Sequence, residues 1–157
     1  MDLESLKTTL GLVPLPQEGG FYAETYRSTE KLSGGRSLST AIYFLLTPDS
    51  FSALHRLASD EIWHFYLGDP VEMVQLAPPG SGRLLTLGAD LASGMRPQIV
   101  VPHGVWQGAS LLPGGKFALL GATVSPGFEF ADFELGQREP LLAAFPEFSE
   151  SIAALTR

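Results

Sequence analysis

The chain has 157 residues, of which 45% are hydrophobic, so it can enclose a core and does not belong to the disordered class. Its formal net charge of −7 disfavours nucleic acids and membrane surfaces as partners, because both are negatively charged. The chain contains no cysteine, which excludes disulfides, thiolate nucleophiles and cysteine-based metal sites.

The N-terminal residues are acidic where a secretory signal would be basic. The longest apolar run, residues 41–46, is too short to cross a bilayer. Together with the lack of cysteine, these features predict a cytoplasmic protein with no membrane partner.

A short helix is predicted over residues 2–10. Asp2 is a suitable N-cap, three leucines form an apolar stripe, and Gly11 stands where a helix would end. Alternating side chains over residues 21–26 then predict a first strand.

Short predicted strands follow one another through the middle of the chain, separated by turns rich in glycine and proline. This regular spacing is typical of an antiparallel sandwich or barrel. Two short helices are predicted at the C-terminal end, the first beginning near Pro140. Without a repeat or linker, residues 1–157 are expected to form a single domain. The predicted strands are 38–46, 51–57, 61–67, 71–77, 83–87, 97–101, 105–112, 117–124 and 128–135.

The candidate chemistry lies on both sides of one predicted turn. His55 and Glu61 flank residues 58–60, so a turn there would let two strands aim both side chains at one point. Such a pair can share a proton, orient a ligand, or act as base and acid. If Glu61 points into the barrel, Trp63 and Phe65 share its face because strand side chains alternate.

This segment resembles the first cupin motif, in which a His-x-His pair is followed by a Glu and a Gly. His55 matches the first His, Glu61 the Glu and Gly68 the closing Gly, whereas Leu57 stands in place of the second His. The turn Pro102-His103-Gly104 resembles the second cupin motif, with Gln107 in the position of that motif's His and Leu111 in that of its Asn.

A wider resemblance extends over nearly the whole chain. Residues 17–22, 60–64 and 126–133 are similar to segments of small stand-alone cupins of a domain-of-unknown-function type. The resemblance implies an all-β fold, a double-stranded β-helix (jelly-roll) cupin barrel with short N-terminal and C-terminal helices, similar to deoxysugar-nucleotide epimerases. It also implies a homodimer.

The expected cofactor content follows from the altered motif. Cupin metals are usually held by three His and one Glu, but here only His55, Glu61 and the weak amide of Gln107 are offered. We therefore expect no resident metal, and at most a weakly bound divalent ion on these three residues.

The leading hypothesis is a cupin that binds a small polar organic ligand, such as a sugar derivative, in its barrel. One alternative is a metal-independent isomerase or epimerase with His55 as base and Glu61 tuning it. Others are a metal-dependent oxygenase using His55, Glu61 and Gln107, and a structural or partner-binding dimer. Of the two enzymes, the isomerase is favoured. Beside the catalytic candidates His55 and Glu61, the ligand-binding candidates are Trp63, Phe65, Gln107, Tyr43 and His103.

Two sets of residues have a purely structural interpretation. Trp63 and Tyr43 could each be ordinary core aromatics, and His64 is expected on the outer face of its strand. The acidic side chains Glu129, Asp132 and Glu134 are interpreted as a solvated strand face.

Overall fold

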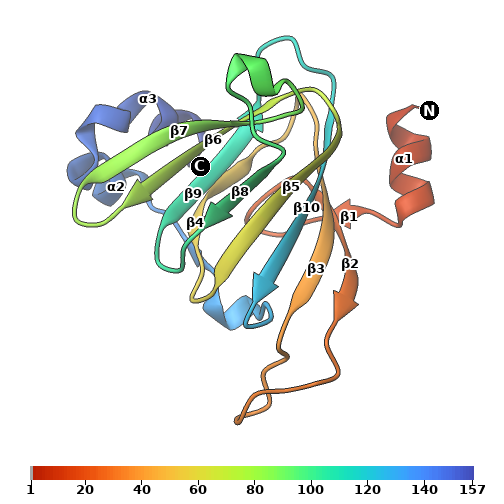
Figure 1. Cartoon of the computed structure of the whole chain (residues 1–157). Helices are drawn as coiled ribbons and strands as arrows, with labels where there is room; N and C mark the ends of the chain where they lie inside the picture. Colours follow the sequence, from red (N-terminus) through yellow and green to blue (C-terminus); the bar gives the residue numbers. More distant parts are fainter. Residues whose placement is uncertain (1) are drawn as a thin grey trace.

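Two antiparallel sheets face each other in the computed structural model, which describes residues 2–157 (Figure 1). The six-stranded sheet has the order β1-β2-β3-β10-β5-β8, and the five-stranded sheet has the order β11-β4-β9-β6-β7. The predicted all-β, jelly-roll type of barrel is confirmed. Its strands are β1 (Val13–Pro14), β2 (Phe21–Arg27), β3 (Thr40–Leu46), β4 (Ser52–Arg56), β5 (Asp60–Gly68), β6 (Val71–Ala77), β7 (Ser81–Leu87), β8 (Gln98–Val101), β9 (Trp106–Leu111), β10 (Ala118–Ser125) and β11 (Glu134–Leu135).

The N-terminal helix α1 (Leu3–Leu10) has the predicted N-cap and C-cap residues and begins one residue after the predicted start. The carboxylate of Asp2 accepts a hydrogen bond of 2.8 Å from the backbone N–H of Ser5, and Gly11 has a φ of 65° at the C-cap. Two helices lie near the C-terminus, α2 (Arg138–Ala144) and α3 (Ser149–Ala154). Short 3-10 turns are η1 (Leu91–Ser93), η2 (Phe130–Asp132) and η3 (Pro146–Phe148). No helix within residues 2–157 is long and apolar enough to cross a membrane.

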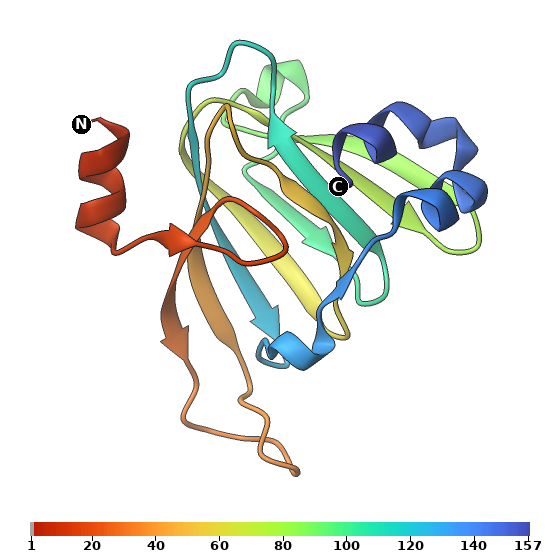
Figure 2. The ribbon, with the colours of Figure 1, turned by 180° about the vertical axis from the view of Figure 1, so that it is seen from behind.

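The helices cover outer faces of the sheets, so the molecule has three apolar clusters. The largest cluster fills the space between the sheets and includes Phe44 and Trp63. Adjacent Leu45 points the opposite way and joins Leu6 of α1 outside the six-stranded sheet. Helices α2 and α3 bury their apolar side chains against the outer face of the five-stranded sheet, on the opposite side of the molecule from α1 (Figures 1 and 2).

The predicted turn between His55 and Glu61 connects the two sheets. β4 belongs to the five-stranded sheet and β5 to the six-stranded sheet, with residues 57–59 between them. The predicted alternation in β5 is also observed. Glu61 and Trp63 are buried, while His64 lies on the other face within 3.1 Å of the Thr123 hydroxyl.

The predicted strand over residues 128–135 is wrong. A 3-10 turn, η2, occupies its middle, and only Glu134 and Leu135 form a strand, β11, which pairs with β4. The interpretation of its acidic side chains as a solvated strand face holds only in part: Glu129 and Glu134 are exposed, but only Glu134 lies on a strand, and each acidic side chain binds an arginine from another part of the chain. The pairs are Glu129 with Arg27 at 3.2 Å, Asp132 with Arg36, and Glu134 with Arg56 at 2.7 Å.

The end of β5 depends on a glycine that closes the first motif. Gly68 has a φ of 100°, and a Cβ atom there would lie 2.4 Å from the carbonyl oxygen of Phe117. We expect Gly68→Ala to lower the free energy of unfolding by about 3 kcal/mol, because backbone strain and a steric clash add together. Urea unfolding followed by circular dichroism would measure this loss.

Gly34 provides the matched control for this substitution. Its φ is 97°, but a Cβ atom there would meet no atom within 4 Å. Gly34→Ala should therefore cost only about 1 kcal/mol, from backbone strain alone. Equal losses for the two variants would show that close packing at Gly68 is unimportant.

Candidate functional site

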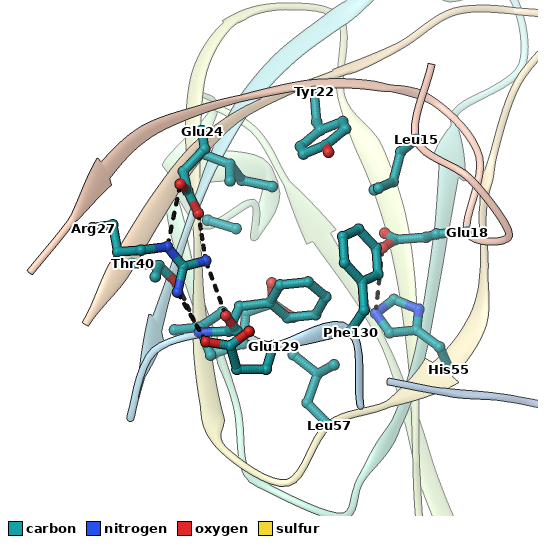
Figure 3. A pocket seen from close by; sticks show the side chains of 15 residues that line it. Leu15, Glu18, Tyr22, Glu24, Arg27, Thr40, His55, Leu57, Glu129 and Phe130 are labelled. Carbon is teal, nitrogen blue, oxygen red and sulfur yellow. Dashed lines mark hydrogen bonds and ion pairs between the residues drawn. The ribbon is translucent and has the colours of Figure 1, made fainter. Parts of the chain in front are cut away.

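A cavity of about 280 Å³ lies at the end of the barrel where β4 and β5 approach each other (Figure 3). Apolar side chains make most of its wall, and polar groups from separate elements face it. The lining residues are Leu15, Glu18, Tyr22, Glu24, Arg27, Thr40, Ile42, His55, Leu57, Glu61, Ala122, Val124, Phe128, Glu129 and Phe130.

His55 points into this cavity from β4 with a fixed tautomer. Its Nδ1 lies 2.7 Å from the carbonyl oxygen of Ala53, which can only accept a hydrogen bond, so Nδ1 carries the proton. Nε2 therefore bears the lone pair. Burial lowers the pKa of His55, against the opposing effect of the Glu61 charge, and the ring is neutral near pH 7. The ring of Phe133 stacks on it, with centroids 5.0 Å apart.

Glu61 reaches the cavity from β5 and is oriented by a chain of two hydrogen bonds. The indole N–H of Trp63 donates to Oε1 of Gln107 at 2.7 Å, and the Gln107 amide donates to Oε2 of Glu61 at 2.6 Å. Because the indole can only donate, it fixes which end of the amide faces Glu61. Burial raises the pKa of Glu61 to about 7; the charge of Glu18 adds to this, and His55 and the hydrogen bonds oppose it.

A second buried carboxyl group, Glu18, comes from the loop between β1 and β2. Its Oε1 accepts a hydrogen bond of 2.6 Å from the Ser52 hydroxyl, and its Oε2 lies 3.9 Å from Nε2 of His55. Burial raises the pKa of Glu18 to about 7, with the Ser52 hydrogen bond opposing the shift. Since His55 is neutral, the contact between these two residues is not an ion pair near pH 7.

The loop that carries Glu18 is held close to the barrel. The backbone N–H of Ala53 donates to the Glu18 carbonyl oxygen at 2.9 Å, and the Arg157 guanidinium donates to the same oxygen at 3.2 Å. At Gly19, a Cβ atom would lie 2.4 Å from the Phe51 carbonyl oxygen, so only glycine permits this approach.

The other side of the cavity is closed by residues 126–135, which we call the strap. Phe128, Glu129 and Phe130 of the strap line the cavity. At its mouth the Arg27 guanidinium binds Glu24 at 2.7 Å and Glu129 at 3.2 Å (Figure 3). The strap therefore joins the site through charged as well as aromatic side chains.

The structure brings some of the predicted site residues together and separates others. His55 and Glu61 line the cavity, whereas Gln107 and Trp63 lie behind Glu61 as its hydrogen-bonded support. Phe65 packs against the cluster between the sheets and does not line the cavity.

Two predicted ligand-binding residues lie away from His55. Tyr43 is on the outer face of β3, next to Tyr66 with ring centroids 6.2 Å apart. His103 is exposed in the turn before β9, where its Nδ1 lies 3.0 Å from the Asp60 carboxylate. Neither contributes to the cavity wall.

Sequence reasoning missed Glu18, Arg27 and the strap residues as parts of the site. In the sequence, the segment containing Glu18 carries only a resemblance to the small stand-alone cupins. The signal that could have marked Glu18 is an acidic side chain directly before two glycines, in a loop that must pack closely against the barrel.

The donor set does not fit the metal that cupin barrels commonly hold. Leu57 offers no ligand atom, and Oε1 of Gln107 is already bound to Trp63 while its N–H group faces Glu61. Within residues 2–157, no group of three or more His, Asp or Glu side chains is arranged to hold a metal ion.

A two-sheet barrel with one enclosed end and a buried cluster of polar groups facing it defines a cupin-type pocket. The chain belongs to the DUF985 family of the cupin superfamily. The model of this family matches residues 4–136. The uncharacterized protein YML079W of Saccharomyces cerevisiae is 34% identical over 158 residues, which cover 88% of this chain and 79% of that protein.

Solved structures agree with this assignment. Protein SO0799 from Shewanella oneidensis is 39% identical with a TM-score of 0.93, over 100% of this chain and 98% of that one. A hypothetical protein from Leishmania major is 35% identical with a TM-score of 0.90, over 99% of each chain. An oxalate decarboxylase from B. subtilis, 15% identical with a TM-score of 0.58 over 92% of this chain and 37% of its own, shares the fold alone.

The raised pKa of Glu18 predicts how stability depends on pH. The folded pKa of about 7 exceeds the ordinary value of 4.5, so the folded state holds the extra proton between these values and loses stability as pH rises through this window. Glu18→Gln retains an acceptor for Ser52 and cannot ionise. Its free energy of unfolding relative to wild type should rise by about 1 to 3 kcal/mol between pH 5 and pH 8.

Urea unfolding at both pH values measures this difference. Glu150→Gln is the control, because Glu150 is exposed on α3 and its removal should shift stability equally at pH 5 and pH 8. A constant difference between Glu18→Gln and wild type would contradict the raised pKa.

Proposed function

We propose that the protein binds a small polar organic ligand in the cavity beneath the strap, with His55, Glu18 and Glu61 contacting its polar part. The observation that carries this proposal is the burial of three ionisable groups around one cavity whose wall is mostly apolar. Burying ionisable groups lowers the stability of the fold, so their presence around a cavity indicates a functional site. A ligand that pairs with them would account for their burial. The size and enclosure of the cavity suit a molecule of a few to about ten heavy atoms.

Proton transfer to and from the ligand is the second candidate function, as in an isomerase or epimerase. The fixed tautomer of His55 favours it, because the Nε2 lone pair faces the cavity and is available as a base. Glu18 and Glu61, with pKa values of about 7, are each suited to return a proton near neutral pH. The same neutral His55 and protonated carboxyls can also bind a ligand without chemistry.

Ligand binding is tested by filling the cavity from one wall. Val124 is buried on β10 and lines the cavity, so Val124→Phe should occupy part of its volume. Native mass spectrometry of protein purified from cell extract should show an added small-molecule mass on wild type. We expect the bound fraction to fall at least tenfold in Val124→Phe.

Leu84→Phe is the control, because Leu84 lies on β7 of the other sheet, does not line the cavity and is 50% exposed. It should keep the wild-type bound fraction. An added mass that survives in Val124→Phe, or no added mass and no ligand density in crystals soaked with fragments, would contradict binding in this cavity.

Proton transfer is tested with the ligand recovered in this way, incubated with the protein in D₂O. An isomerase should exchange a carbon-bound hydrogen for deuterium, and His55→Gln should slow the exchange at least a hundredfold because it removes the base. Nuclear magnetic resonance of the ligand follows the exchange. If wild type leaves every carbon-bound hydrogen in place, the protein is a binder and not an isomerase.

The assembly and extent of the domain stay predictions. The chain is expected to form a homodimer and to fold as one unit over residues 1–157. The exposed side chains of Tyr66, Leu67 and Val100 on the outer face of the six-stranded sheet are the apolar surface available to a second copy.

A further inference from the structure

The charges around the cavity are strongly unbalanced. Four glutamates line it, Glu18, Glu24, Glu61 and Glu129, and within residues 2–157 Arg27 is the one lysine or arginine that does so. Arg27 is fully engaged, because its guanidinium binds Glu24 and Glu129 and donates to the Phe128 carbonyl oxygen at 3.1 Å. An anionic ligand would meet carboxylates without a free cation to offset them.

Once Glu18 is ionised, the unpaired polar atoms at the inner end of the cavity are acceptors. Nε2 of His55 carries a lone pair because Nδ1 holds the proton, and Oε2 of Glu18 faces it at 3.9 Å, beyond hydrogen-bond distance. Neither atom has a hydrogen-bond partner within residues 2–157. Both are accessible from the cavity, because no fully buried side-chain nitrogen or oxygen atom among these residues lacks a partner. Glu61 is close enough for its charge to affect His55.

A group that only donates hydrogen bonds complements a cluster of acceptors. An ammonium group has three N–H donors, no acceptor, and a positive charge. Within a buried site such a charge-assisted hydrogen bond to a carboxylate is stronger than one between neutral groups. Much of the remaining wall is apolar, and the rings of Tyr22, Phe128 and Phe130 also suit a cation or an apolar body.

We propose that the ligand of this cavity is a small organic ammonium ion, whose nitrogen binds among Glu18, His55 and Glu61 while its apolar part contacts the aromatic wall. This inference rests on the proposed ligand-binding function and names the chemical class of the ligand. It excludes carboxylates and phosphorylated sugars as preferred occupants.

Binding of an ammonium ion should be linked to proton release. Glu18 from the loop and Glu61 from β5 must ionise to pair with it, whereas His55 from β4 must stay neutral. Glu24 and Arg27 from β2 and Glu129 from the strap are the other ionisable groups that face the cavity. Because both buried carboxyl groups have pKa values of about 7, affinity should increase from pH 6 to pH 8 as they lose their protons.

Three probes of one shape and different charge separate the alternatives. We would titrate the full chain with benzylamine, benzyl alcohol and benzoate by isothermal calorimetry at pH 8, and repeat the benzylamine titration at pH 6. We expect benzylamine to bind at least tenfold more tightly than benzyl alcohol, benzoate to give no binding, and benzylamine affinity to fall at least threefold at pH 6.

Charge-neutralising variants locate the ammonium site. Glu18→Gln and Glu61→Gln should each weaken benzylamine at least tenfold, and by a much larger factor than they weaken the uncharged benzyl alcohol. The exposed control Glu150→Gln should change neither. Circular dichroism verifies folding, and the comparison of the three probes on wild type needs no variant.

The possible failures are distinguishable. If benzyl alcohol or benzoate binds as tightly as benzylamine, or if both glutamine variants keep wild-type benzylamine affinity, the ammonium proposal is wrong while ligand binding in the cavity stands. If none of the three probes binds wild type, the ammonium proposal is wrong and the cavity also loses support as a binding site for small organic molecules.

Discussion

The burial of Glu18, His55 and Glu61 around one cavity is the constraint on which the rest of this end of the barrel depends. A buried ionisable group must have fixed polar partners or it destabilises the fold. The Ser52 hydroxyl donates a hydrogen bond to Glu18, the Ala53 carbonyl oxygen accepts one from His55, and the Gln107 amide donates one to Glu61. Burial raises the pKa of both carboxyl groups to about 7 and lowers the pKa of the imidazole, so below neutral pH the protons stay on the carboxyl groups and off His55.

Core packing and site geometry are coupled by the same polar chain. Trp63 is a core aromatic that packs edge-on against Phe44, with ring centroids 5.2 Å apart, yet its N–H fixes the amide of Gln107. The amide in turn fixes Glu61. A residue that never touches the cavity therefore decides how a cavity carboxyl group is presented. The cupin motif position filled by Gln107 has in this way become a support for the site and not a ligand for a metal.

The motif spacing predicted the placement of His55 and Glu61 because both flank one short turn, and a local turn is readable from sequence. Glu18 was not predictable in the same way, since its contact with Ser52 joins residues far apart in the chain through a tightly packed loop. The role of Gln107 depends on which end of its amide is bound by the Trp63 indole. This orientation arises from a contact between distant residues and cannot be predicted from the sequence. Alternating phenylalanine and acidic residues in 128–135 have the pattern of a strand, but η2 interrupts it and only Glu134 and Leu135 pair with β4. The ion pairs of this segment join it to three arginines that are distant in the sequence, and such contacts cannot be inferred from the local pattern.

The strap also covers an edge of the barrel. Its last two residues form β11, which pairs with β4 and so covers the outer edge of the five-stranded sheet. An uncovered edge strand presents free N–H and C=O groups to which another molecule can add a strand. Any motion that lifts the whole strap to admit a ligand would therefore also expose that edge. The pairing of β11 with β4 thus protects this part of the sheet edge against the addition of a foreign strand.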